Sequence, residues 1–229
     1  MSQHILPTNP PVTVVLRRSA RARRISLRVS RLDGTVSLTV PKGVREREAL
    51  GFAEEKAAWI LAQLARQPDL VQVSLGSMVP VGGRPRHVVA GQGRSVVLGV
   101  EEIAVPGDPA RAGARVQGFL KELARNRLAE AVDHYAAELG RVPTRMTLRD
   151  TRSRWGSCSS AGALMFSWRL VMAPSEILDY VAAHEVAHLA EMNHSQAFWD
   201  QVERVHGDYK EQRNWLRVQG QELHRYRFS

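Results

Sequence analysis

The stretch APSEILDYVAAHEVAHLAEMNHSQAFW, residues 173–199, is the most informative part of this sequence for the fold and for the candidate site. Pro174 and Ser175 are typical of a helix start, and apolar residues then recur at helical spacing. Asn193 is expected to end this helix in a left-handed conformation, and Ser195 is a suitable cap for the next one. The stretch therefore predicts a half-buried helix that runs to Asn193 and is followed by a bend.

Two histidines on this helix are four residues apart. Because one helical turn takes about 3.6 residues, His184 and His188 project from the same face and can share a cation. Glu185 lies beside them without being a ligand, where a base could take a proton from water on that cation. This is the H-E-x-x-H arrangement of zinc hydrolases, in which the metal lowers the pKa of its water toward ~7.

A catalytic zinc ion usually takes three protein ligands and keeps one position open. A bend at Asn193 would fold His194 back toward the first two histidines. The spacing resembles three-histidine sites of the form H-E-x-x-H-x-x-G-x-x-H, except that Glu191 stands at the glycine position, so the bend is expected later. Three downstream residues remain as alternative third ligands: Glu203, His206 and Asp208.

The helix is apolar around these polar residues. Two histidines and a glutamate on a half-buried helix need partners that offset their desolvation, and a metal ion supplies them. Zinc is the default for three imidazoles, although Ni²⁺, Co²⁺ or Mn²⁺ also suit such a site. A purely structural zinc module is the alternative, and it would have no need of Glu185.

The order of expected elements indicates an α+β fold, with a boundary near residue 107. Residues 1–107 form a β-rich N-terminal subdomain, and residues 108–229 form the domain that carries the histidines. The expected strands lie in 12–40, with a tight turn at Asp33-Gly34, and in 72–105 and 145–172, and the expected helices cover 45–66, 109–139, 173–193, 196–206 and about 209–224. Asp108 is expected to cap the long helix, with Pro109 at its first position, and Gly140 to end it.

The net charge of +9 raises the question of an anionic partner, because much of the excess lies early. The early basic residues are Arg17, Arg18, Arg21, Arg23, Arg24, Arg28 and Arg31. They alternate with Ile25, Leu27 and Val29 as in a half-buried strand, and no aromatic residue is interleaved for base stacking. We therefore expect a solvated basic face that makes weak, non-specific contact with nucleic acid at most.

Cysteine usage and hydropathy bear on the compartment. Cys158 is the only cysteine, which excludes an intramolecular disulfide and favours a reducing cytoplasm. No apolar run approaches the ~20 residues of a membrane span, and the N-terminus does not have the pattern of a signal peptide. We expect a cytoplasmic protein that does not enter a membrane.

The motifs RWGSC, WRL, AP, LDYV, HE, AHL, NHS and FW follow one another over residues 149–224. This region resembles the YgjP-like metal-dependent hydrolases, relatives of the WLM and SprT-like metallopeptidases, and a weaker likeness extends to residues 17–43. The resemblance implies a zincin-like core, in which an active-site helix packs on a small sheet and an edge strand flanks the cleft. It implies His184, His188 and His194 as metal ligands, Glu185 as the catalytic acid/base, and peptidase-like activity.

Several residues near the H-E-x-x-H motif in sequence have more than one expected role or a role in packing. Arg154 could bind a substrate carboxylate or steady an oxyanion, with a structural ion pair as the alternative. Gly156 would let a substrate backbone approach closely. Cys158 is expected to be a small buried or loop residue, and Trp155, Trp168, Phe198 and Trp199 are expected to belong to the core.

Three classes of substrate fit the expected zinc hydrolase. A peptide or protein is the leading substrate. An anionic small molecule with a phosphoanhydride bond, such as a nucleotide, is the second, because four arginines lie near the motif: Arg149, Arg152, Arg154 and Arg169. A protein bound on DNA is the third, with the basic N-terminal sheet as the DNA contact.

Overall fold

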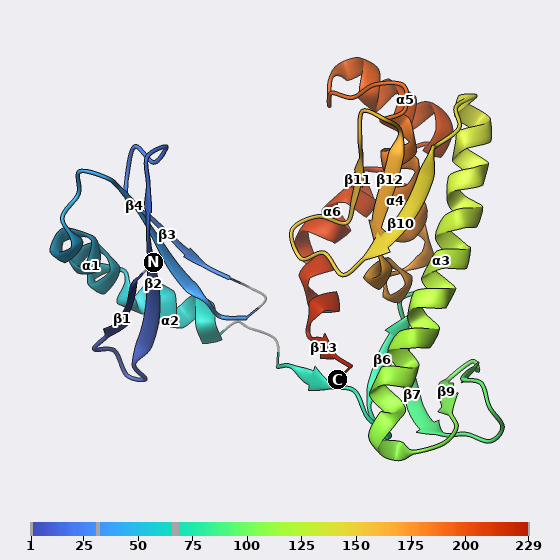
Figure 1. The fold of residues 1–229 in the computed structure, drawn as a ribbon, viewed down its shortest axis with the longest axis horizontal. Helices are drawn as coiled ribbons and strands as arrows, with labels where there is room; N and C mark the ends of the chain where they lie inside the picture. The colour runs from blue at the N-terminus through green and yellow to red at the C-terminus, as the bar shows by residue number, and fades with distance from the viewer. Residues whose placement is uncertain (1, 31–32, 66–68, 229) are drawn as a thin grey trace. The chain divides into compact units, whose positions relative to one another are not determined.

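The computed structural model describes residues 2–30, 33–65 and 69–228, and the chain divides into two compact units, Met1–Asp69 and Leu70–Ser229 (Figure 1). This division lies earlier than the boundary expected near residue 107. The reason is that strand residues Val79, Val88 and Ile103 share one buried core with the helix that follows them. The strands between residues 70 and 107 therefore belong to the second unit.

The first unit is built on a four-stranded sheet in the order β1-β2-β4-β3. Its strands are β1 (Ser2–Leu6), β2 (Val12–Ser19), β3 (Ser26–Val29) and β4 (Val36–Pro41). Strands β2 and β4 are parallel, and the other two pairings are antiparallel. Alternate residues of β2 and β4 are buried, which is the period-2 pattern that predicted three of these strands, whereas β1 was not anticipated.

Two helices complete this unit in place of the single helix expected over 45–66. They are α1 (Glu46–Glu55) and α2 (Ala57–Ala65), and Arg66 lies outside the described residues. The interruption is at Lys56, whose φ of −93° and ψ of 9° depart from helical values. Ala53 and Ile60, on either side of the interruption, are both fully buried in the core of this unit.

The early arginines of this unit face solvent. Arg17, Arg18, Arg21, Arg23, Arg24 and Arg28 are exposed, and Arg31 lies outside the described residues. Ile25, Leu27 and Val29 pack against the core of the unit, as the alternation predicted.

The second unit contains the 28-residue helix α3 (Ala112–Leu139), which ends at Gly140 with a φ of 68°. Asp108 caps the preceding turn as predicted, since its carboxylate accepts a hydrogen bond from the Ala110 amide at 2.9 Å. However, Pro109–Arg111 form a short 3₁₀ helix before α3 begins. A small sheet in the order β6-β7-β9-β8 packs near the start of α3, and its strands are β6 (Met78–Val81), β7 (Arg84–Ala90), β8 (Val97–Leu98) and β9 (Glu102–Val105).

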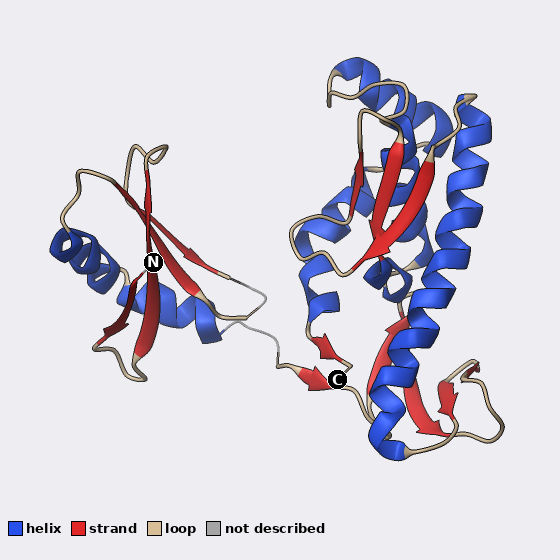
Figure 2. Cartoon of the chain, viewed as in Figure 1, coloured by secondary structure: helices blue, strands red, loops and turns tan. Residues whose placement is uncertain are grey.

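A second sheet of this unit carries the motif region (Figure 2). Its strands are β10 (Arg145–Arg149), β11 (Gly156–Cys158) and β12 (Ala163–Ser167), in the order β10-β12-β11, so that β11 is an edge strand. The 3₁₀ helix Trp168–Met172 follows β12 and replaces strand structure at the end of the range 145–172, where strands were expected. Three helices come next: α4 (Ser175–Ala187), α5 (Gln196–His206) and α6 (Lys210–Val218). A 3₁₀ helix over Gly220–His224 follows. The last strand, β13 (Tyr226–Arg227), pairs in parallel with β5 (Val71–Gln72).

The motif helix α4 ends at Ala187, six residues before the expected stop at Asn193. The amides of Leu189 and Ala190 bond three residues back, to Val186 and Ala187, so the chain tightens and leaves the helix there. No described residue other than glycine has a positive φ, so a left-handed Asn193 is wrong. The bend that carries His194 is therefore a loop over residues 188–195.

Within the described residues, no helix combines the length and the apolar character that crossing a lipid bilayer requires.

Arg169 fastens the C-terminal segment to the motif sheet. Arg169 is 4% exposed, and its guanidinium donates to both carboxylate oxygens of Asp150, at 2.6 and 3.1 Å. The same group donates to the backbone carbonyls of Leu223 and Tyr226. Burial alone would raise the pKa of Asp150, but the hydrogen bonds and charge of Arg169 outweigh it and hold that pKa below its usual value.

This pair makes a testable contribution to stability. Asp150→Asn should lower the free energy of unfolding at pH 7 by about 1–2 kcal/mol, a modest figure because the Asp150 side chain is 44% exposed. Since the folded-state pKa lies below the unfolded one, this contribution is present above the unfolded pKa near ~4 and is lost as pH falls through the folded value. Urea unfolding of both proteins at pH 7 and at pH 3 measures it.

The exposed pair Glu122–Arg125 provides the control. Glu122→Gln should change the stability at either pH by no more than a few tenths of a kcal/mol. If the stability difference between Asp150→Asn and wild type stayed constant from pH 7 to pH 3, the pairing of ionised Asp150 with Arg169 would not stabilise the fold.

Candidate metal centre

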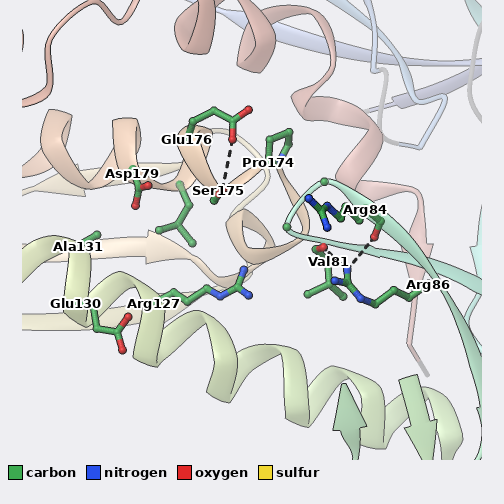
Figure 3. Close-up of a pocket in the computed structure, with 13 residues that line it drawn as sticks. Val81, Arg84, Arg86, Arg127, Glu130, Ala131, Pro174, Ser175, Glu176 and Asp179 are labelled. Carbon is green, nitrogen blue, oxygen red and sulfur yellow. Dashed lines mark hydrogen bonds between the residues drawn. The ribbon is translucent and has the colours of Figure 1, made fainter. Parts of the chain in front are cut away.

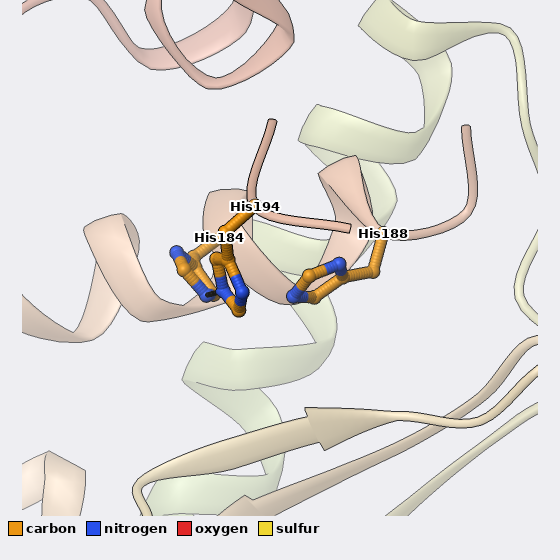
Figure 4. Close-up of side chains that lie close together, drawn as sticks. All are labelled: His184, His188 and His194. Carbon is orange, nitrogen blue, oxygen red and sulfur yellow. Dashed lines mark hydrogen bonds between the residues drawn. The ribbon is translucent and has the colours of Figure 1, made fainter. Parts of the chain in front are cut away.

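Three histidine side chains converge at the end of α4 (Figure 4). His184 lies in the last turn of α4, His188 is the residue that follows it, and His194 comes from the loop before α5. One ligand atom from each lies within 4.8 Å of the others. The alternatives Glu203, His206 and Asp208 are not part of any such cluster of described residues.

The imidazole geometry fits a shared cation. The Nε2 atoms of His184 and His194 are 3.1 Å apart, which suits two ligands of one ion as well as a hydrogen bond. His188 Nδ1 lies 3.0 Å from the Glu191 carbonyl, and donation to it fixes the tautomer and leaves Nε2 free. His184 Nδ1 is buried and has no partner among the described residues.

Aromatic rings hold the histidines in place. Phe198 of α5 is fully buried, and its ring centroid lies 4.4 Å from that of His188 in a stacked arrangement. The same ring meets His184 and His194 edge-on, at 4.9 and 4.8 Å. Phe198 is a core residue, as expected, and its ring also packs against all three imidazoles.

Glu185, the residue after His184, is buried at the end of α4. It is 6% exposed and has no hydrogen-bond partner in the described part of the chain. A Cβ atom on Gly156 of strand β11 would come within 2.5 Å of the Glu185 carboxylate. Gly156 therefore makes room for this side chain, which differs from the close approach of a substrate backbone that the sequence suggested.

Burial governs the electrostatics of the centre. It raises the pKa of Glu185 to about 8, and the positive charge of Arg154 offsets this only in part. It lowers the pKa of His184 to about 3, helped by the neighbouring imidazoles and Arg213. The pKa of His188 is lowered for the same main reason, against its hydrogen bond to Glu191. Both imidazoles are therefore neutral at pH 7, which is the form that binds metals.

An open pocket of about 520 Å³ connects these groups. Glu185 and the three histidines form one side, and Ser153, Arg154 and the edge strand β11 contribute the other. Arg154 is exposed and lines this pocket, as does Cys158, whose thiol pKa is raised by burial and by the charge of Glu185.

The four arginines near the motif have different surroundings. Arg149, Arg152 and Arg154 are exposed, but only Arg154 is among the described residues that line this pocket. Arg169 is buried and bonded to Asp150, so the idea that it binds an anionic substrate is wrong.

A column of stacked side chains beside the histidines was not foreseen. Tyr180 stacks on Tyr209, Tyr209 on Trp199, and the guanidinium of Arg213 lies over Trp199, at 5.9, 4.9 and 4.7 Å. Tyr180 also touches the His184 ring edge-on, and burial raises its pKa to about 12. The spacing of Tyr209 and Arg213 puts them on one helix face, but nothing in the sequence indicates that this face meets Trp199.

The family of this chain follows from its match to a family model. The crystal structure of the metallopeptidase zymogen of Pyrococcus abyssi abylysin matches 40% of this chain and 95% of its own, at 24% sequence identity and a TM-score of 0.36. No curated protein matches the chain. The model of the YgjP-like family, described as a metallopeptidase domain, matches residues 23–219. This match spans most of the sequence, and the chain belongs to the YgjP-like family of metallopeptidases.

Proposed function

We propose that this protein is a zinc-dependent peptidase whose metal ion is held by His184, His188 and His194. The observation that carries the proposal is the meeting of three imidazoles and one buried, unbonded carboxylate at a single open pocket. Nothing in the local packing explains why a carboxylate is kept there. A bound zinc ion would supply Lewis acidity toward a carbonyl oxygen and would lower the pKa of water toward ~7.

In this proposal Glu185 is the group that moves the proton. Its carboxylate accepts a proton from the attacking water and returns it to the nitrogen that leaves when the peptide bond breaks. A divalent cation held by the three imidazoles would favour the ionised carboxylate, because a nearby opposite charge counteracts the effect of burial. Gly156 leaves the space that this side chain occupies, since a Cβ there would clash with its carboxylate.

The substrate in this proposal is an extended peptide that lies along β11. Strand β11 pairs only with β12 among the described strands, so its outer edge can accept main-chain hydrogen bonds. Arg154 lines the same pocket and is suited to a substrate carboxylate or a developing oxyanion. The family match favours a peptide over a phosphoanhydride.

The ligand set is tested by removing one histidine. His194→Ala should weaken zinc affinity by more than the about 10–100-fold that loss of an outer-shell partner costs, because a direct ligand is removed. Competition of the purified protein with a chromophoric chelator measures this affinity. The control is Glu203→Ala, an exposed residue that was a candidate ligand, and it should bind zinc as wild type does. If His194→Ala bound zinc tightly and Glu203→Ala bound it weakly, Glu203 and not His194 would be the third ligand.

The base is tested by Glu185→Gln. The amide keeps the size of the carboxylate but cannot take up a proton at neutral pH, so hydrolysis of fluorescently labelled casein should fall by about 10²–10⁴-fold. Stoichiometric zinc and a thermal midpoint near that of wild type should be retained. Glu203→Gln is the matched control and should keep full activity. Undiminished hydrolysis by Glu185→Gln would remove Glu185 as the base.

The room for the base is tested at Gly156. Gly156→Ala would push the Glu185 side chain aside, and a misplacement of about 1 Å lowers turnover by about 100-fold. Zinc content should not change, because the three atoms nearest to the added methyl group all belong to Glu185 and none to a histidine. Gly118→Ala in α3, where a Cβ has nothing within 4 Å, is the control. If Gly156→Ala hydrolysed labelled casein at the wild-type rate, the contact would have no bearing on catalysis.

A further inference from the structure

A second pocket lies at the opposite end of α4 from the histidines. It has a volume of about 730 Å³, within the range of about 300–1,000 Å³ that small-ligand sites occupy. The β6–β7 hairpin, the middle of α3 and the first turn of α4 surround it. Ser175 begins α4 and lines this pocket, and His184 comes nine residues later, which is about 14 Å along a helix.

Six charged side chains line this pocket. Three are arginines, Arg84, Arg86 and Arg127, and three are carboxylates, Glu130, Glu176 and Asp179. None of the six forms an ion pair with any described residue, although both signs of charge line one cavity. Opposite charges that share a pocket without pairing leave room for a ligand between them.

The arginines are gathered at one side of the pocket (Figure 3). Arg86 is held there by backbone carbonyls, since it donates to Gly99, Val81 and Arg84. Burial lowers the pKa of Arg86, and the positive charges of Arg84 and Arg127 lower it further, so the three guanidinium groups repel one another. An anionic group placed among them would relieve this repulsion.

The carboxylates lie toward the other side, on α3 and α4 (Figure 3). Glu130 has no hydrogen bond to a described residue, and Glu176 accepts only a long one from Ser175, at 3.4 Å. Burial and the charge of Glu176 raise the pKa of Asp179, against the positive charges of His206, His134 and Arg127. This side of the pocket therefore disfavours a second anion and suits a cation.

We propose that this pocket binds a short zwitterionic peptide. The carboxylate of the peptide lies among Arg84, Arg86 and Arg127, and its ammonium group faces Glu130, Glu176 and Asp179. Arginine forks suit carboxylates because they donate two parallel hydrogen bonds. Gly82 and Gly83 hold the hairpin tight against residues 171–174, because their amides donate to the carbonyls of Val171 and Met172 and a Cβ on Gly83 would meet Pro174. This site is separate from the histidines and does not depend on the proposed peptidase activity.

Three probes of equal length and different charge test the proposal. Triglycine is zwitterionic, N-acetyl-triglycine is an anion, and triglycinamide is a cation. Each is titrated at pH 7 into the zinc-loaded Glu185→Gln protein, which should not cleave them, and binding is followed by calorimetry and by the NMR shifts of the Gly82, Gly83 and Ser175 amides. Triglycine should bind at least about tenfold more tightly than either capped probe, because each cap removes one charged contact.

Variants locate the binding. Arg84→Met and Arg127→Met should each weaken triglycine binding by about tenfold or more, and exposed Arg84 is the variant least able to disturb folding. Arg125→Met, on the solvent side of the same helix as Arg127, should bind as before. Equal affinities for triglycine and N-acetyl-triglycine would contradict the proposal that the pocket recognises both charges of a zwitterionic peptide. No shift of the three amides at millimolar triglycine, or unchanged affinity in Arg84→Met, would overturn the site.

Discussion

The candidate site depends on one physical constraint, which is the burial of a carboxylate without a hydrogen-bond partner. Glu185 is 6% exposed, and charge in such a place is unfavourable unless an opposite charge lies close by. Arg154 provides some positive charge, but the pKa of Glu185 remains raised to about 8. The three imidazoles beside it are a ligand set that suits a divalent cation, so the metal that they would hold is also the partner that the carboxylate lacks.

Helix α4 is the element that makes this possible. Its apolar residues are buried against α3 and the motif sheet, so its ends and its polar face are held at fixed positions. The C-terminal end presents His184 and Glu185 beside edge strand β11, where Gly156 leaves the space that a side chain would fill. The N-terminal end opens into the pocket with unpaired charges. One helix thus carries the candidate metal centre at one end and the proposed binding pocket at the other.

The parts of this arrangement that follow from local spacing could be predicted from sequence. The i, i+4 histidines and the adjacent Glu185 are consequences of helical geometry, and Asp108, Pro109 and Gly140 mark helix ends through backbone chemistry. What failed depends on tertiary packing. Sequence cannot distinguish buried Arg169 from exposed Arg154, and the stop expected at Asn193 was overridden by the earlier turn at Leu189 and Ala190. The boundary near residue 107 failed because the short strands before it share the core of α3.

The central claim is that three imidazoles and no sulfur hold the metal, even though Cys158 lines the same pocket. X-ray absorption spectroscopy of the zinc-loaded protein measures this directly. The account predicts three nitrogen ligands from imidazole and one oxygen ligand, all at about 2.0–2.2 Å. A sulfur ligand near ~2.3 Å, or a coordination shell with only two imidazoles, would contradict it.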